Sequence, residues 1–162
     1  MPPPSKYLAT YLNDHMLGAT AGRELVRRAA RENEGAELGG FLAPLADELH
    51  ADREALKAIM GELGVKVDRA KVAAGWTAEK VGRLKPNAQL RGYSPLSPLV
   101  ELEGLLIGIQ GKLAMWSVVA EVAHELGLDR ARLEALSARA ERQQADVERH
   151  RREVGRRALT AG

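Results

Sequence analysis

The sequence has no cysteine and few aromatic residues: one phenylalanine, two tryptophans and three tyrosines among 162 residues. The lack of cysteine excludes disulfides, thiolate metal sites and a cysteine nucleophile. An aromatic content of 4 % argues against a sheet protein. No glycine-rich phosphate loop follows a strand, and no Ser-His-Asp order is defensible. Nothing in the sequence therefore points to an enzyme.

Targeting and membrane-spanning signals are also missing. Residues 1–4 have neither a basic region nor an apolar run, so we expect no signal peptide. The most apolar stretch, residues 96–122, carries four charged side chains, Glu101, Glu103, Lys112 and Glu121. These charges argue against a membrane-spanning helix. We therefore expect a cytoplasmic protein.

What is present is a helical pattern. Apolar residues make up 45 % of the chain and recur with helical spacing, which predicts an all-α protein. We expect a single domain over residues 1–162, with flexible ends at 1–4 and 158–162. The expected long helices cover residues 5–32, the stretch after the turn at 33–35 up to about 63, residues 97–126 and residues 129–157. A shorter helix is expected between Asp68 and Leu84, before an irregular loop over 87–95.

Capping residues and glycines set the expected helix ends. Ser5, Asp68 and Asp129 are suited to N-caps, and Ser97-Pro98 to the N-cap and first residue of the third long helix. Three glycines are expected to end helices: Gly35, Gly64 and Gly127. Pro44 cannot donate a backbone hydrogen bond, so it predicts a kink in the second helix or a later start.

This layout resembles the ferritin-like four-helix bundles, in which two antiparallel helix pairs are joined by a long connection that here contains a short extra helix. In that superfamily, di-iron members have a Glu on each of two helices and Glu-x-x-His on the other two. The chain has one Glu-x-x-His, Glu121 to His124, and one Asp-x-x-His, Asp47 to His50. Helical spacing places Asp47 and His50 off the apolar face, and the carboxylates that would match Glu121 and His124 are missing. The di-iron motif is therefore not intact.

A different polar pair is expected to face inward. His15 lies in the apolar stripe of the first helix, and Asp52 lies in that of the second. In an antiparallel hairpin whose turn is centred at 33.5, the two residues share one level. We therefore predict a hydrogen bond between them, as a buried pair that fixes helix register or, in the functional interpretation, as ligands or an acid/base pair.

The direction of the third long helix determines which of its residues comes close to His15 and Asp52. If it runs antiparallel to the second helix, Glu103 arrives at that level; if the two are parallel, Gln110 does. His15, Asp52 and Glu103, with Glu121 as a weaker substitute, could then hold iron, manganese or zinc. With Gln110 instead, the set is a closed hydrogen-bond network.

Glycines form a second feature of the third helix. Gly104, Gly108 and Gly111 share one face of a helix that is apolar nearly all round. Either the short helix between residues 68 and 84 covers this face, or a second copy of the chain does in a homodimer.

Charge is uneven although the net charge is only +2. Residues 65–93 carry seven basic and two acidic side chains. This segment could bind an anion or a nucleic acid through five candidate residues, Lys71, Trp76, Lys80, Lys85 and Arg91. Interleaved acids and the lack of a known nucleic-acid-binding motif weaken that interpretation.

The sequence thus favours a non-catalytic helical bundle that binds a protein partner or a small ligand, with a homodimer as the expected assembly. The alternatives are a degenerate metal site in the core and an anion site in the basic segment.

Overall fold

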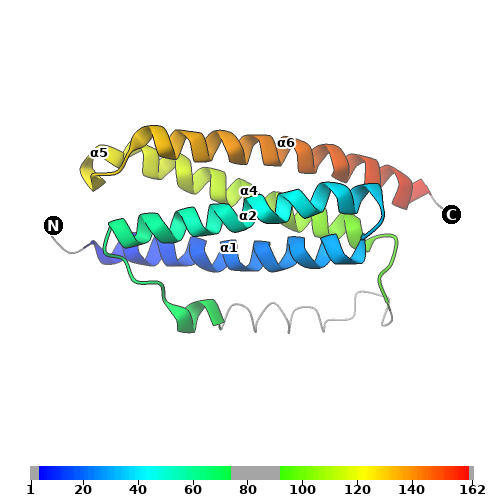
Figure 1. Ribbon diagram of the computed structural model, residues 1–162, viewed down its shortest axis with the longest axis horizontal. Helices are drawn as coiled ribbons and strands as arrows, with labels where there is room; N and C mark the ends of the chain where they lie inside the picture. The colour runs from blue at the N-terminus through cyan, green and yellow to red at the C-terminus, as the bar shows by residue number, and fades with distance from the viewer. Residues whose placement is uncertain (1–3, 74–91, 161–162) are drawn as a thin grey trace.

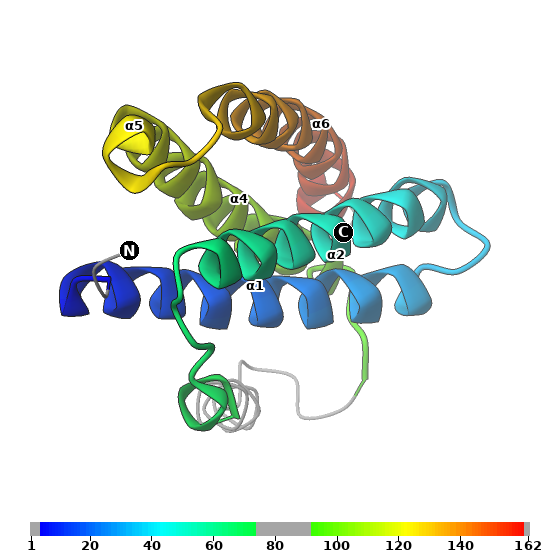
Figure 2. The same cartoon turned by 60° about the vertical axis from the view of Figure 1, so that its left-hand side comes forward.

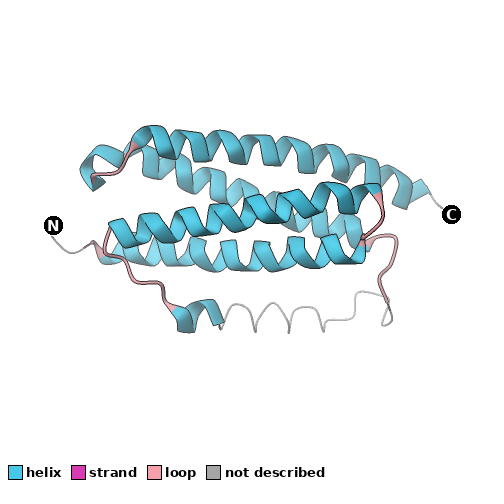
Figure 3. Ribbon diagram, in the orientation of Figure 1, coloured by secondary structure: helices cyan, strands magenta, loops and turns pink. Residues whose placement is uncertain are grey.

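The computed structural model describes residues 4–73 and 92–160, and within these ranges it contains helices and no strand (Figures 1 and 3). The helices are α1 (Lys6–Glu32), α2 (Glu37–Glu62), α4 (Ser97–Glu121), α5 (Ala123–Leu126) and α6 (Arg130–Thr160). Residues 69–73 are helical as well. The prediction of an all-α protein is confirmed.

The long helices form two antiparallel pairs, α1 with α2 and α4 with α6, packed side by side (Figure 2). The amide of Asn33, directly after α1, donates to the hydroxyl of Tyr93, just before α4, at 2.7 Å. The start of α4 therefore lies beside the turn between α1 and α2. It follows that α4 runs parallel to α2 and antiparallel to α1 (Figure 1).

Three of the expected N-cap residues, Ser5, Asp68 and Asp129, act where the sequence places them. Ser5 Oγ accepts from the Leu8 amide at 3.1 Å, and Asp129 Oδ1 accepts from the Ala131 amide at 3.0 Å. Gly35 has φ 81°, a left-handed conformation that favours glycine. At Gly39, a Cβ atom would lie 2.1 Å from the Asn33 carbonyl oxygen. The α1–α2 turn is therefore tight because both glycines are present.

Four boundaries differ from the prediction. The helix expected to reach 126 ends at Glu121, and Val122 separates it from α5. The N-cap of α4 is Leu96 rather than Ser97. A start of α2 after Pro44 is wrong, because this exposed proline lies inside the helix. The helix expected to end near 157 continues to Thr160, whose hydroxyl donates to the Arg156 carbonyl at 2.7 Å.

Two groups of buried apolar side chains form the core. One contains Leu12, Met16, Leu56, Met115 and Trp116, and the other contains Val26, Leu42, Leu45, Leu105 and Ile109. The predicted apolar stripe of α2 is buried at six positions, Leu42, Leu45, Leu49, Leu56, Ile59 and Leu63. Burial of apolar area from three or four helices at once is what holds the two pairs together.

Helix α4 is the exception to this pattern, because part of its apolar surface faces outward. Val100, Ile107, Val118 and Val122 are between 42 % and 76 % exposed and follow one stripe of the helix and its end. By length and composition, α4 could cross a membrane, although the core helix of a soluble protein passes the same test. We call these four residues the α4 stripe.

Candidate functional site

Asp52 is buried on α2 and is held by two cations from the opposite helix pair. Lys112 of α4 donates to Oδ2 at 2.5 Å, and Arg139 of α6 donates to Oδ1 through Nε at 2.7 Å and also through Nη2. The side chain of Asp52 is 3 % exposed, and that of Lys112 is 13 % exposed. Attraction between these charges is strong because little water screens them.

An amide extends this cluster. Gln143 of α6 is buried in the apolar stripe of its helix, where its Oε1 accepts from Lys112 and its Nε2 donates to Asp52 at 3.1 Å. The same Nε2 donates to Glu48 at 2.8 Å. We call these five residues, Glu48, Asp52, Lys112, Arg139 and Gln143, the central polar cluster. It joins α2, α4 and α6 and contains two positive and two negative charges.

Burial shapes the acid–base behaviour of this cluster. Removal from water lowers the pKa of Lys112 below its usual range, and Arg139 acts in the same direction. Asp52 and Glu48 oppose the shift by stabilising the ammonium form. The neighbouring carboxylates are therefore what compensates the buried ammonium group.

His15 does not join Asp52, so the predicted hydrogen bond is wrong. The carboxylate of Asp52 is directed toward α4 and α6, where charged and amide donors satisfy both of its oxygens. His15 instead packs edge-on against the Tyr11 ring, with the ring centroids 4.6 Å apart. Burial lowers the pKa of His15, while Asp14 opposes the shift. Two cations are stronger partners for a buried carboxylate than a neutral imidazole is.

Neither residue expected from α4 reaches Asp52. Glu103 is 3.6 Å from Arg151 of α6 and half exposed, and Gln110 is exposed and accepts from Gln144 at 2.6 Å. The parallel arrangement of α2 and α4 brings Lys112 to this level instead. Among the described residues, no three His, Asp or Glu side chains lie close enough to hold a metal ion. The set of His15, Asp52 and Glu103 is therefore not a metal site.

Next to the central polar cluster lies a cavity of about 180 Å³ between α1, α2 and α4. Its lining is mainly apolar and includes Leu49, Leu56, Leu105, Ile109, Met115 and Trp116. Polar side chains meet it as well, namely Asp14, His15, Arg23, Asp52 and Lys112. His15 and Asp52 thus lie on one cavity without contacting each other.

Glycines on α1 and α4 make room for this cavity. Gly18, Gly22, Gly108 and Gly111 all line it, and a Cβ atom on any of them would meet nothing within 4 Å. Gly104 differs, because its Cβ would lie 3.1 Å from Leu25 of α1. At Gly104 the glycine face of α4 is therefore covered by α1. The sequence offered two covers, a second chain and the short helix between residues 68 and 84; residues 74–84 of that helix lie outside the described residues.

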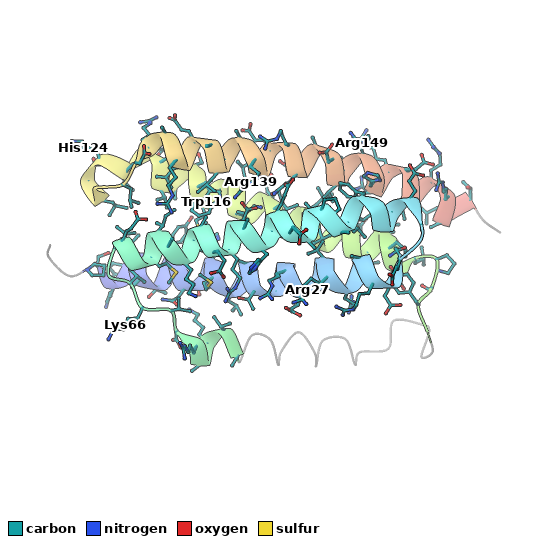
Figure 4. All side chains as sticks on the ribbon, viewed as in Figure 1. Arg27, Lys66, Trp116, His124, Arg139 and Arg149 are labelled. Atoms are coloured by element: carbon teal, nitrogen blue, oxygen red, sulfur yellow. The ribbon has the colours of Figure 1, made fainter. Side chains whose placement is uncertain are left out.

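Three polar groups on the cavity lack a partner. Trp116 is 1 % exposed, and its indole Nε1 is buried with no hydrogen-bond acceptor in the part of the chain that is described. His15 makes no hydrogen bond, and Arg23 no ion pair, with any residue of 4–73 or 92–160. Trp116 lies toward the C-terminal end of α4, and Figure 4 labels it together with Arg139 of α6. A buried N–H without an acceptor costs about 1–3 kcal/mol.

A second buried polar group lies near the α1–α2 turn. Glu101 of α4 is 5 % exposed and accepts from Arg28 through Nε and Nη2 at 3.0 and 2.8 Å. Tyr93 donates to its other oxygen at 2.6 Å, and Asn33 donates to the Tyr93 hydroxyl. Burial, with Glu101 acting in the same direction, raises the pKa of Tyr93. We call these four residues the end cluster.

The remaining candidates lie on the surface or outside the described residues. Asp47 and His50 are exposed, as predicted from their place off the apolar face, and His124 is exposed beside an exposed Glu121 (Figure 4). Lys71, one of the five candidate anion-binding residues of the basic segment 65–93, forms an ion pair with Asp14 of α1. The other four candidates, Trp76, Lys80, Lys85 and Arg91, lie outside the described residues.

Sequence reasoning missed Lys112, Arg139 and Gln143. Gln143 interrupts an otherwise apolar stripe of α6, Leu133, Leu136, Ala140 and Val147, and Lys112 is the one basic residue in the apolar helix α4. Both are polar residues at positions where the pattern demands apolar ones. That exception was a usable signal for a buried network.

Comparison of the chain with models of protein families, with curated proteins and with solved structures finds no match. The function is therefore inferred from the geometry of the site.

Proposed function

We propose that this protein is a non-catalytic binding protein that takes a small organic molecule into the cavity between α1, α2 and α4. The carrying observation is the cavity itself, about 180 Å³, which reaches the surface beside the exposed residues Asp14, Gly18 and Gly108. A cavity of about 150 Å³ lined by apolar side chains is large enough to hold benzene. The ligand is therefore the size of a substituted benzene ring.

The construction of the cavity supports this proposal. Unfilled space costs stability, and an alanine at Gly22 or Gly108 would fill part of it without a clash while improving helix propensity. The open positions lie on both α1 and α4, so the space is shared between the helices rather than left by one small side chain. The central polar cluster ties α2 and α4, two of the helices that line the cavity, to each other and to α6.

Toluene is a suitable probe because it matches the size and the apolar lining. We expect it to raise the unfolding temperature in a concentration-dependent way, since a ligand that binds only the folded state stabilises it. Gly22→Leu fills the cavity and should abolish this shift. Gly61→Leu is the matched control: Gly61 lies on the exposed side of α2, and its Cβ would also meet nothing within 4 Å. Equal shifts in both variants would contradict the proposal.

The ferritin-like fold belongs to this proposal too. Two antiparallel pairs with α2 parallel to α4, and a long connection between them, agree with the layout of that superfamily. We place the protein in the cytoplasm on the sequence pattern alone.

A homodimer is a second part of the proposal, and the α4 stripe supports it. Its four apolar side chains are exposed along one line, and a two-fold contact would bring this line against itself. Ile107→Lys should then convert a dimer to a monomer in analytical ultracentrifugation. Leu159→Lys is the control, because Leu159 is equally exposed but lies on α6. A wild-type monomer at high concentration would refute the dimer.

A further inference from the structure

The exposed apolar residues of α4 and its two caps are spaced symmetrically along the helix. Five large ones are between 42 % and 76 % exposed, Leu96, Val100, Ile107, Val118 and Val122. Position 109 is midway between residues 96 and 122, and also midway between residues 100 and 118. The counterpart of residue 107 is residue 111, a glycine. If two copies pair antiparallel about a two-fold axis at this position, each exposed apolar side chain meets another one or a glycine.

Side-chain size follows the same symmetry. Gly108 and Gly111 lie close to the midpoint, and a Cβ atom on either would meet nothing within 4 Å. Small residues at a crossing point let two helix backbones come close together. The larger side chains lie toward both ends of α4, where two helices that cross at an angle diverge. Because Gly111 is one turn after Ile107, it lies on the same face as the α4 stripe.

Charges distinguish the antiparallel arrangement from a parallel one. Glu103 and Glu121 are the exposed carboxylates of α4, and both flank the α4 stripe. In a parallel two-fold pair, each would lie beside its own copy and repel it. In the antiparallel pair, Glu121 lies level with residue 97 of the second copy, in the first turn of α4. No side chain of the described residues caps that turn, and free amides at a helix N-terminus favour a carboxylate.

We infer that a second copy of the chain packs its α4 antiparallel on the α4 stripe and closes the cavity with its Ile107. The Ile107 side chain of the second copy lies level with Gly111, which lines the cavity, and beside the mouth at exposed Gly108. This inference rests on the proposed binding function and homodimer, and adds the register of the two copies and a cavity that one copy leaves open. Ligand binding and dimerisation then strengthen each other.

The register is tested with single cysteines, because the chain has none of its own. Val100→Cys and Val118→Cys are mixed in equal amounts, left to exchange subunits and treated with a short bismaleimide. The mixture should give a covalent dimer on a denaturing gel, because residue 100 of one copy lies beside residue 118 of the other. Either variant alone should give about ten-fold less, since its two cysteines are about 27 Å apart at 1.5 Å per residue.

The closed cavity is tested with toluene and the variant Ile107→Lys. Ile107 is not among the described residues that line the cavity, so the substitution leaves the wall of its own chain unchanged. Toluene should still bind about ten-fold more weakly to this variant than to the wild type in calorimetry, because the side chain that closes the mouth belongs to the other copy. Leu159→Lys, on α6, should bind toluene like the wild type.

The wild-type protein gives a second measurement that needs no variant. Saturating toluene should lower its dimer dissociation constant by about a hundred-fold in analytical ultracentrifugation, because each of the two cavities contributes the ten-fold factor. An unchanged dissociation constant would refute the closed cavity even if Ile107→Lys failed to fold.

The outcomes separate this inference from the functions on which it rests. If each cysteine variant crosslinks alone as well as the mixture does, or if the fully labelled mixture gives no covalent dimer, the antiparallel register is refuted. If toluene binds the wild type and Ile107→Lys equally, the closed cavity is refuted and the binding function stands. If toluene binds neither protein, the binding function and the closed cavity fail together, and the cysteine experiment still decides the register.

Discussion

The central polar cluster and the end cluster each bury one carboxylate, but they differ in what surrounds it. Asp52 is held between Lys112 and Arg139 in the middle of the molecule, beside a cavity. Glu101 is held by Arg28 and Tyr93 next to a tight turn, where a surface groove is lined by Asn33 of the same cluster but not by Glu101 itself. Both clusters tie separate helices together, but the carboxylate of the central one also lines the cavity between α1, α2 and α4.

This difference indicates two roles for buried charge. In the end cluster, the partners of Glu101 are Arg28 of α1 and Tyr93 near the end of the long connection, so the cluster fastens the start of α4 to the α1–α2 turn. In the central cluster, cations from α4 and α6 bind a carboxylate of α2 that also lines the cavity. A buried ion pair can fix one arrangement of helices even where an apolar pair would be equally stable.

Removal of Asp52 should give the largest effect. Asp52→Ala leaves Lys112 and Arg139 without their carboxylate in a poorly screened site, and the loss should be about 3–5 kcal/mol of unfolding free energy. Urea denaturation followed by circular dichroism measures it. The control is the triple variant Asp52→Leu, Lys112→Met, Arg139→Leu, which removes the charges together and should recover most of the loss. A triple variant as unstable as Asp52→Ala would contradict this account.

Removal of Glu101 should cost less. Glu101→Ala leaves Arg28, whose side chain is 31 % exposed and can turn its charge to water, whereas Lys112 is only 13 % exposed. The expected loss is about 1–3 kcal/mol. The same denaturation experiment checks it. A loss larger than that of Asp52→Ala would mean that the end cluster, and not the central one, dominates the stability of the helix packing.

The helices were predictable from the sequence because their signals are local. Side-chain caps at Ser5 and Asp129 and the left-handed glycine at Gly35 act within four residues of their partners. The break at Val122 was not predictable, because the apolar spacing continues through it. Pro44 was misread as a possible start of α2: the carbonyl that it leaves without a donor, that of Gly40, belongs to an exposed residue.

The site was predictable only in part, because it depends on how the two helix pairs meet. Burial of Asp52 followed from its position in the stripe of α2, and that prediction is confirmed. Its partners lie 60 and 87 positions further along the chain, and their choice depends on α4 running parallel to α2. The glycine face of α4 was recognised, but the cavity between it and α1 required the positions of both helices.

Removal of one hydroxyl from the end cluster should have a smaller effect than either carboxylate variant. Tyr93→Phe keeps the ring but removes the donor to Glu101 and the acceptor for Asn33, while both bonds from Arg28 remain. The expected loss is about 1 kcal/mol. Tyr7→Phe is the control, since Tyr7 is 77 % exposed. Equal losses in both variants would mean that the hydroxyl of Tyr93 does not fasten α4 to the turn.

Protonation of His15 should give the smallest effect and probes the cavity side of the comparison. Burial lowers the pKa of His15 in the folded protein relative to about 6.5 in the unfolded chain. The unfolded chain therefore binds more protons between the two values, so stability falls as the pH decreases from about 6.5 through the folded-state pKa. Each histidine can contribute at most about 1.4 kcal/mol per pH unit.

His150, stacked on Phe41, has its pKa lowered in the same way and keeps part of this dependence. His15→Gln should therefore make the decline between pH 7 and 5 shallower without abolishing it, as urea denaturation at a series of pH values measures. Identical slopes for the wild type and His15→Gln would show that the imidazole is as well hydrated in the cavity wall as in the unfolded chain.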